Sequence, residues 1–232
     1  MIGIIGAMDI EVNGIIEQMT DVRQETVSGN VFTCGKIFGK ECVTVRCGIG
    51  KVNAAVAAQT MILKYRPAMV INTGVGGSTS LTTHIGHIVI AENVIQHDMD
   101  TTALGDKNGT IFFSGGSIDY IPCDKELVAR LENACRAAGE ENFVVGTVAT
   151  GDQFIVGNDR RSVLNNQFHA IACEMEGGSI GHVCYLNKVP FAVLRCISDS
   201  MSEEDDAVEY SVFSVSAARK SIEILLQFIR HS

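Results

Sequence analysis

The sequence predicts a single α/β domain over residues 1–232, in which helices cover both faces of a mostly parallel sheet. Short apolar runs alternate with segments of helical periodicity, a pattern typical of strands that are buried on both faces. Glycine-rich turns lie where several of these runs end. One hydrophobic core can serve a chain of this length, and no internal repeat, low-complexity segment or linker divides it.

The first half of the chain alternates strands and helices. A helix over 51–65 is the clearest element, because Val52, Val56 and Ile62 recur at helical spacing and Pro67 ends the run. Apolar β-rich runs define the strands, and glycines near residue 39 indicate a hairpin. The predicted elements are a strand at 1–6, a helix at 8–19, strands at 31–38 and 41–47, the helix at 51–65, and strands at 69–72 and 86–91.

The second half opens with a polar, glycine-rich stretch over 96–120, which has no clear period and is predicted as a long loop. The next helix has defined ends, since Asp124 suits an N-terminal cap and Gly139 suits a stop. The remaining predicted elements are the helix at 124–139, strands at 143–149 and 170–173, a helix at 179–186, a strand at 190–197 and a long helix at 207–229.

The composition argues against several classes of partner. The formal net charge is −9 and no basic run offers a surface for nucleic acid or an anionic membrane. No apolar run reaches the roughly 20 residues of a membrane span, and the N-terminus reaches Asp9 without the basic region of a signal peptide. The eight cysteines include no CxxC pair. We therefore expect reduced, buried thiols and a cytoplasmic protein.

Acidic residues gather where the predicted strands end, which is where open α/β sheets bind ligands. They are Glu11, Asp152, Glu174, Glu176 and Asp199. Acidic residues also cap the helices that follow a strand, so for any one of them capping is an equally good explanation. The repetition after several strands favours a ligand site.

Two glycine-rich segments, 48–51 and 74–77, are predicted as tight turns whose N–H groups could bind a phosphate. Neither is a P-loop or a complete G-x-G-x-x-G fingerprint, so close backbone packing is the favoured interpretation. No G-x-S-x-G elbow indicates an α/β-hydrolase. The segment 97–100 (HDMD) has no partners at metal-ligand spacing. We predict neither a metal nor a cofactor.

The turns carry six segments in an order that is specific as a set: MIGIIGAMDIE (1–11), GIGKVN (48–53), NTG (72–74), TGDQFI (150–155), EME (174–176) and RCISD (195–199). Together they resemble the 5′-methylthioadenosine/S-adenosylhomocysteine nucleosidases of the nucleoside phosphorylase and hydrolase superfamily. The resemblance covers essentially the whole chain.

This resemblance implies a single domain with a mixed, twisted central sheet, and a homodimer. It implies hydrolysis of 5′-methylthioadenosine and S-adenosylhomocysteine, and of 5′-deoxyadenosine, to adenine and the 5-substituted ribose in methionine salvage. Water is then the co-substrate and no cofactor takes part.

The resemblance also assigns roles by position. Glu11 matches the carboxylate that activates water, and Glu176 the one that binds the ribose hydroxyls. Asp199 matches the acid that acts at adenine N7, with Ser198 beside it. The other matching positions contact the sugar, the base or the 5′-substituent: Met175 under the sugar with Arg195 nearby, Phe154 stacked on adenine with the Ile155 backbone at the base edge, and Met8, Ile49 and Tyr210 around the sugar and the 5′-group. Asp152 and Glu174 are expected to be structural.

The chemistry suits these residue types independently. Cleavage of a C1′–N9 bond creates a cationic sugar and an anionic base. A buried carboxyl group such as Asp199 can hold a proton for the leaving base. Glu11 can orient and deprotonate the water, and one carboxylate, Glu176, can accept two hydroxyl hydrogen bonds while it stabilises the sugar cation.

Four positions depart from the common family pattern and leave the preferred 5′-group open. Val75 and Cys47 stand where serine is common, Leu104 where a phenylalanine that reaches the partner subunit is common, and Tyr210 where phenylalanine is common. A phosphorolytic nucleoside phosphorylase is an alternative on the same fold, but the carboxylates after the first glycine turn would repel phosphate. An aminodeoxyfutalosine-type nucleosidase and a non-catalytic nucleoside-binding protein are further alternatives, and the three intact carboxylates argue against the second.

Overall fold

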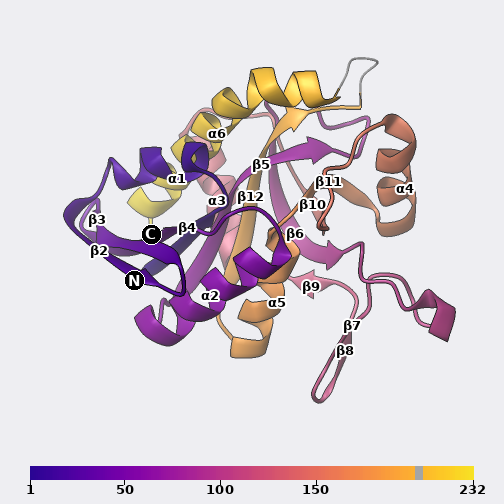
Figure 1. Cartoon of the computed structure of the whole chain (residues 1–232). Coiled ribbons are helices and arrows are strands. Elements are labelled where there is room, and N and C mark those ends of the chain that lie inside the picture. Colours follow the sequence, from indigo (N-terminus) through magenta and orange to yellow (C-terminus); the bar gives the residue numbers. More distant parts are fainter. Residues whose placement is uncertain (202–205) are drawn as a thin grey trace.

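The centre of the molecule is a mixed sheet, seen in a computed structural model that describes residues 1–201 and 206–232 (Figure 1). Along the sheet the strands follow the order β11-β10-β6-β12-β5-β1-β4-β3-β2, with β9 paired to β6. Its strands are β1 (Ile2–Gly6), β2 (Thr20–Val27), β3 (Asn30–Ile37), β4 (Lys40–Arg46), β5 (Met69–Ser78), β6 (Ile88–Gln96), β9 (Ile121–Pro122), β10 (Phe143–Thr150), β11 (Ala170–Glu174) and β12 (Phe191–Asp199).

Parallel pairing in the middle of the sheet brings the carboxyl ends of distant strands to one edge. Strand β1 runs parallel to β4 and β5, β12 is parallel to β5, and β10 is parallel to β6 and β11. Antiparallel pairs extend the sheet through β3 and β2 and join β12 to β6. The predicted mixed sheet is therefore confirmed.

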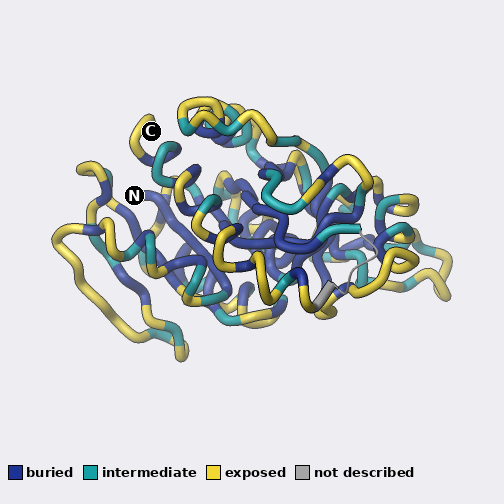
Figure 2. Tube along the Cα trace, turned by 90° about the horizontal axis from the view of Figure 1, so that it is seen from above, coloured by how far each residue is buried: buried dark blue, intermediate teal, exposed yellow. Residues whose placement is uncertain are grey.

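Helices cover both faces of the sheet, and each face has its own apolar core (Figures 1 and 2). The helices are α1 (Asp9–Ile16), α2 (Lys51–Tyr65), α3 (Lys125–Ala137), α4 (Asn158–Phe168), α5 (Gly177–Asn187) and α6 (Asp206–Arg230). Helices α1 and α3 contact α6 on one face, where Ile15, Leu131 and Leu225 are buried. On the other face α2 contacts α5, and Ala57 and Ile180 belong to its core. No helix in the described part of the chain is both long and apolar enough to cross a membrane.

Local sequence signals explain why most elements start and stop where they do. The Asp124 carboxylate accepts hydrogen bonds of 3.0 Å from the N–H groups of Glu126 and Leu127, which caps α3 as predicted. Helix α2 ends at Arg66 in a left-handed conformation, directly before Pro67.

Four expectations need correction. Strand β2 and helix α4 were not predicted, and the stretch 96–120 contains a short helix, η1 (Thr102–Leu104), and a hairpin of β7 (Ile111–Phe113) and β8 (Gly116–Ile118). The predicted turn over 74–77 is wrong, because β5 continues through these glycines to Ser78. A side chain there would collide with the neighbouring carboxylates: a Cβ on Gly77 would lie 2.6 Å from Asp199 Oδ2.

Candidate active site

A pocket of about 250 Å³ opens at the carboxyl end of the parallel strands. This volume is slightly below the range of about 300–1,000 Å³ that is usual for small-molecule sites. Both carboxylates and apolar side chains line it. The lining residues are Ala7, Met8, Glu11, Ile49, Val75, Gly76, Gly77, Phe154, Cys173, Glu174, Met175, Glu176, Ser198, Asp199 and Tyr210.

Glu11 lies in the first turn of α1 and is only 4% exposed. Its Oε2 accepts hydrogen bonds from the N–H groups of Ala7 (2.7 Å) and Met8 (3.0 Å), and its Oε1 accepts one from Val75 (3.1 Å). Burial raises the pKa of Glu11, and the charge of Arg195 and these three N–H groups oppose the rise. Glu11 is thus a fixed carboxylate with an increased affinity for a proton, as a general base requires.

Glu176 is the N-terminal cap residue of α5 and is also buried. Its Oε1 accepts a hydrogen bond of 2.8 Å from the N–H of Gly50, so the glycine turn serves a carboxylate instead of a phosphate. Burial raises the pKa of Glu176 to about 8, and the charge of Glu174 adds to the effect while Arg195 opposes it. A large share of Glu176 is therefore protonated near neutral pH.

Asp199 ends β12 and is 1% exposed. The hydroxyl of Ser198 donates a hydrogen bond of 2.6 Å to Oδ1, and the guanidinium of Arg161 forms an ion pair with Oδ2. The two oxygens of the carboxyl group are thus held from two directions by groups on different elements.

The apolar and aromatic part of the lining includes five residues that the sequence analysis selected: Met8, Ile49, Phe154, Met175 and Tyr210. The rings of Phe154 and Tyr210 meet edge to face, with centroids 5.4 Å apart, and the Tyr210 hydroxyl donates to Met8 Sδ at 3.2 Å. Phe154 and Ile49 are 43% and 55% exposed, so they stand at the mouth. A flat apolar ligand can stack on such an aromatic wall.

Two other selected residues do not line the pocket. Ile155 is buried in an apolar cluster with Leu164. Arg195 lies behind the carboxylates, where it forms ion pairs with Glu174 and, at 3.9 Å, with Glu176. Its place favours an electrostatic contribution to the site over direct contact with a ligand.

Of the four departures from the family pattern, three lie at or beside the pocket. Val75 and Tyr210 line it. Burial raises the pKa of Cys47 to about 12, so it is a neutral thiol, and it donates to the carbonyl of Gly48. Leu104 is on the surface, 82% exposed, away from the pocket lining of its own chain.

The remaining acidic residues make the contacts expected of structural groups. Asp152 accepts a hydrogen bond of 2.7 Å from the N–H of Lys51 at the start of α2, and Glu174 accepts one of 2.7 Å from Gly177 at the start of α5. Asp98, in the segment 97–100, forms an ion pair of 2.6 Å with Lys51. Glu174 borders the pocket as well.

Arg161 is the residue of this site that the sequence analysis missed. It lies on α4, whose buried residues are Arg161, Leu164 and Phe168. Their spacing of three and four is helical, but the first member is charged. A search for apolar periodicity therefore finds no helix here.

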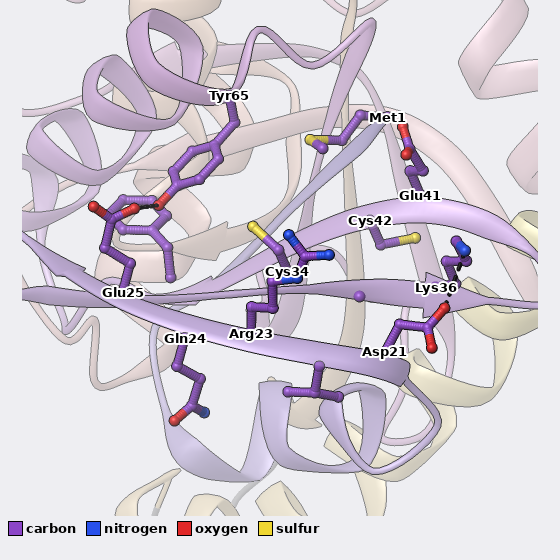
Figure 3. Close-up of a pocket in the computed structure, with 13 residues that line it drawn as sticks. Met1, Asp21, Arg23, Gln24, Glu25, Cys34, Lys36, Glu41, Cys42 and Tyr65 are labelled. Atoms are coloured by element: carbon purple, nitrogen blue, oxygen red, sulfur yellow. Dashed lines mark hydrogen bonds and ion pairs between the residues drawn. The ribbon is translucent and has the colours of Figure 1, made fainter.

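A larger hollow of about 900 Å³ lies on the surface beside β2 and β3 (Figure 3). Two of its carboxylates form ion pairs near the solvent: Asp21 with Lys36, at 3.0 Å, and Glu25 with Lys64 of the neighbouring helix α2. We call it the β2 cleft. None of its residues was selected from the sequence.

Comparison with known proteins agrees with this geometry. A model of the phosphorylase superfamily matches residues 1–230. The 5′-methylthioadenosine/S-adenosylhomocysteine nucleosidase of Shewanella loihica is 40% identical over 231 residues, which cover 99% of each chain. The Neisseria meningitidis nucleosidase in complex with methylthio-immucillin-A superposes with a TM-score of 0.93 at 27% identity, covering 100% of this chain and 99% of that one.

A futalosine hydrolase of Helicobacter pylori gives a TM-score of 0.92 at 31% identity, with 100% of this chain and 97% of that one covered. Further curated relatives, from Shewanella halifaxensis and Aeromonas salmonicida, are nucleosidases of the same kind. The chain therefore belongs to the phosphorylase superfamily and, within it, to the family of 5′-methylthioadenosine/S-adenosylhomocysteine nucleosidases.

Proposed function

We propose that the chain hydrolyses the N-glycosidic bond of 5′-methylthioadenosine and S-adenosylhomocysteine, and also of 5′-deoxyadenosine, in methionine salvage. The observation that carries the proposal is that three carboxylates, Glu11, Glu176 and Asp199, and two aromatic rings, Phe154 and Tyr210, line one pocket. A nucleoside needs both kinds of group, since it joins a hydroxylated sugar to a flat base.

In the proposed reaction the C1′–N9 bond breaks and its electron pair moves to the base. Asp199, which takes up a proton from solvent when the substrate binds, passes that proton to N7 of adenine, so the base leaves as a neutral molecule. Glu11 takes a proton from water as the water oxygen bonds to C1′. The proton gained by Glu11 returns to Asp199 through solvent, which restores both carboxyl groups for the next turnover.

Glu176 binds the two ribose hydroxyls in this scheme. As a carboxylate it accepts a hydrogen bond from each hydroxyl and places a negative charge beside the developing sugar cation. Its raised pKa means that binding is coupled to loss of a proton at neutral pH. Phe154 stacks on the base, and Met175 lies against the sugar.

A second hollow of about 900 Å³ adjoins the pocket at Met8 and Ile49 and provides room for a longer 5′-group. Asp9 and Arg46 line it, 2.8 Å apart in an exposed ion pair. The amino-acid end of S-adenosylhomocysteine carries one charge of each sign, and this pair is complementary to it.

The charge of the pocket supports water over phosphate as the attacking group. The buried cations beside it, Arg161 and Arg195, both already have carboxylate partners, Asp199 and Glu174. A phosphate dianion would therefore find no uncommitted cation among these groups and would lie close to the Glu11 carboxylate.

We also propose a cytoplasmic homodimer. All eight cysteines are free thiols, as in a reducing compartment. Exposed apolar side chains on the adjacent helices α2 and α5, among them Val52, Leu63 and Leu186, offer a surface for a second copy. Light scattering should give a mass of twice 24.9 kDa; a monomer at micromolar concentration would contradict this part of the proposal.

The activity is tested by mixing the protein with 5′-methylthioadenosine, with and without phosphate, and following adenine release. Release that does not depend on phosphate is expected, and a requirement for phosphate would make the protein a phosphorylase. The futalosine hydrolase neighbour gives a second substrate to compare. A higher kcat/KM for aminodeoxyfutalosine than for methylthioadenosine would change the proposed substrate.

A further inference from the structure

Arg161 is an unusual residue for its position on α4. It is 0% exposed, whereas the other two buried residues of the helix, Leu164 and Phe168, are apolar. Burial of a guanidinium costs free energy that only close, charged partners offset. An apolar side chain would serve packing at this position equally well, so the partners of Arg161 point to its use.

The partners that the structure describes lie at the pocket or next to it. Arg161 Nη2 forms the ion pair with Asp199 Oδ2, and Nη1 donates hydrogen bonds to the carbonyl oxygens of Ser78 (2.7 Å) and Asp199 (3.3 Å). One planar guanidinium thereby ties the ends of β5 and β12 to α4. Because Ser198 holds Oδ1 at 2.6 Å, the carboxyl group of Asp199 is fixed at both oxygens.

Strand β5 leaves space for this pair. A Cβ on Gly77 would lie 2.6 Å from Asp199 Oδ2 and 3.0 and 3.1 Å from the two terminal nitrogens of Arg161. Gly77 has an ordinary strand conformation, so its backbone alone does not require glycine. The need for glycine at residue 77 comes from the ion pair.

We propose that Arg161 is a positioning residue that acts through Asp199 on departure of the base. It holds the Asp199 carboxyl group at the wall of the pocket and stabilises the negative charge that this group carries once its proton has moved to the base. Arg161 itself exchanges no proton and does not touch the substrate. The inference rests on the proposed function, because it assumes that Asp199 protonates the leaving base.

Two substrates separate this role from a purely structural one. Adenine must be protonated as it leaves 5′-methylthioadenosine, whereas 4-nitrophenolate leaves 4-nitrophenyl 5-methylthioribofuranoside as a stable anion without a proton. We expect Arg161→Met to lower kcat on methylthioadenosine by roughly 100-fold, within the range of acid–base catalysis, and to change KM little. Its kcat on the nitrophenyl riboside should fall by less than about threefold.

Matched variants make the result specific. Arg160→Met removes the exposed arginine one residue earlier on α4 and should behave like the unmodified protein on both substrates. Asp199→Asn should show the same selective loss as Arg161→Met. The double variant should lose no more activity on methylthioadenosine than Asp199→Asn alone, because both changes disable the same group, the Asp199 carboxyl.

The inference is wrong if Arg161→Met lowers kcat equally on both substrates, or lowers it on neither. If the methionine variant does not fold by circular dichroism, Arg161→Lys, which keeps the charge but not the two-pronged contact, takes its place. A selective loss on methylthioadenosine then supports the inference, and an unchanged substrate ratio overturns it. Failure of the unmodified protein to cleave methylthioadenosine would instead overturn the proposed function.

Discussion

The β2 cleft and the pocket at the end of the sheet are hollows of opposite character. The cleft measures about 900 Å³ against about 250 Å³ for the pocket. In the cleft, Asp21 and Lys36 have side chains that are 64% and 47% exposed (Figure 3), so water and salt screen their charges. In the pocket, Glu11 and Asp199 are 4% and 1% exposed. Charges with so little solvent exposure act strongly on a ligand. The burial of charged groups therefore distinguishes the candidate site better than the volume of the hollow does.

Removal of a buried carboxylate from the pocket should have the largest effect on activity. Glu11→Gln and Asp199→Asn should each lower kcat on methylthioadenosine by roughly 1,000-fold or more, because each removes a proton-transfer group while the shape is kept. Circular dichroism should show an unchanged fold. Near-normal turnover in either variant would remove the role proposed for that residue.

Glu176→Gln should have the next largest effect. The amide keeps one acceptor oxygen but loses the charge that receives the ribose hydroxyls, so we expect binding of a methylthioadenosine analogue to weaken by roughly 10- to 100-fold. Isothermal titration calorimetry measures this directly. An analogue that lacks both ribose hydroxyls is the control, and equal weakening for both analogues would contradict the contact.

Buried carboxyl groups should also make stability depend on pH. The pKa of Glu176 is about 8 in the folded chain and ordinary when unfolded, so the folded state binds the extra proton. Its contribution is complete below about pH 4.5 and is lost as the pH rises through about 8. We expect the free energy of unfolding in urea to fall by roughly 2 kcal/mol from pH 6 to pH 9. In Glu176→Gln that decline should be clearly smaller; an identical decline would contradict the assignment to Glu176.

Arg46 tests the second hollow, which adjoins the pocket at Met8 and Ile49. Arg46→Ala should raise KM for S-adenosylhomocysteine by roughly threefold to tenfold, since the ion pair with Asp9 is exposed and such contacts are weak. Values of KM for methylthioadenosine, which has no amino-acid end, should stay the same. A parallel change for the two substrates would remove the proposed recognition.

The smallest effects should come from the β2 cleft. Asp21→Asn and Glu25→Gln remove charges from exposed ion pairs, so kcat/KM should stay within about twofold and stability within about 1 kcal/mol. They are the matched carboxylate-to-amide controls for Glu11→Gln. A large loss of activity in either would mean that the cleft, too, takes part in function.

Much of the fold and the site followed from local sequence. Alternating apolar runs and helical periods located most strands and helices, since burial on two faces of a sheet imposes those patterns. Motifs at the strand ends selected Glu11, Glu176 and Asp199, which the structure brings to one pocket. The path of β5 did not follow from local sequence. The glycines at 74–77 predicted a turn, but in the structure they lie in a strand and make room for carboxylates from other elements.

Sequence by itself therefore determined most of the elements, their order and the choice of the three carboxylates. Only the tertiary structure decided how those carboxylates are held, because desolvation and ion pairing depend on distance in space. Arg161 lies 38 residues before Asp199 in the chain, on a helix with no apolar period. Arg195 reaches Glu174 and Glu176 from a different strand. These buried cations set the charge of the pocket, and only folding brings them to the carboxylates.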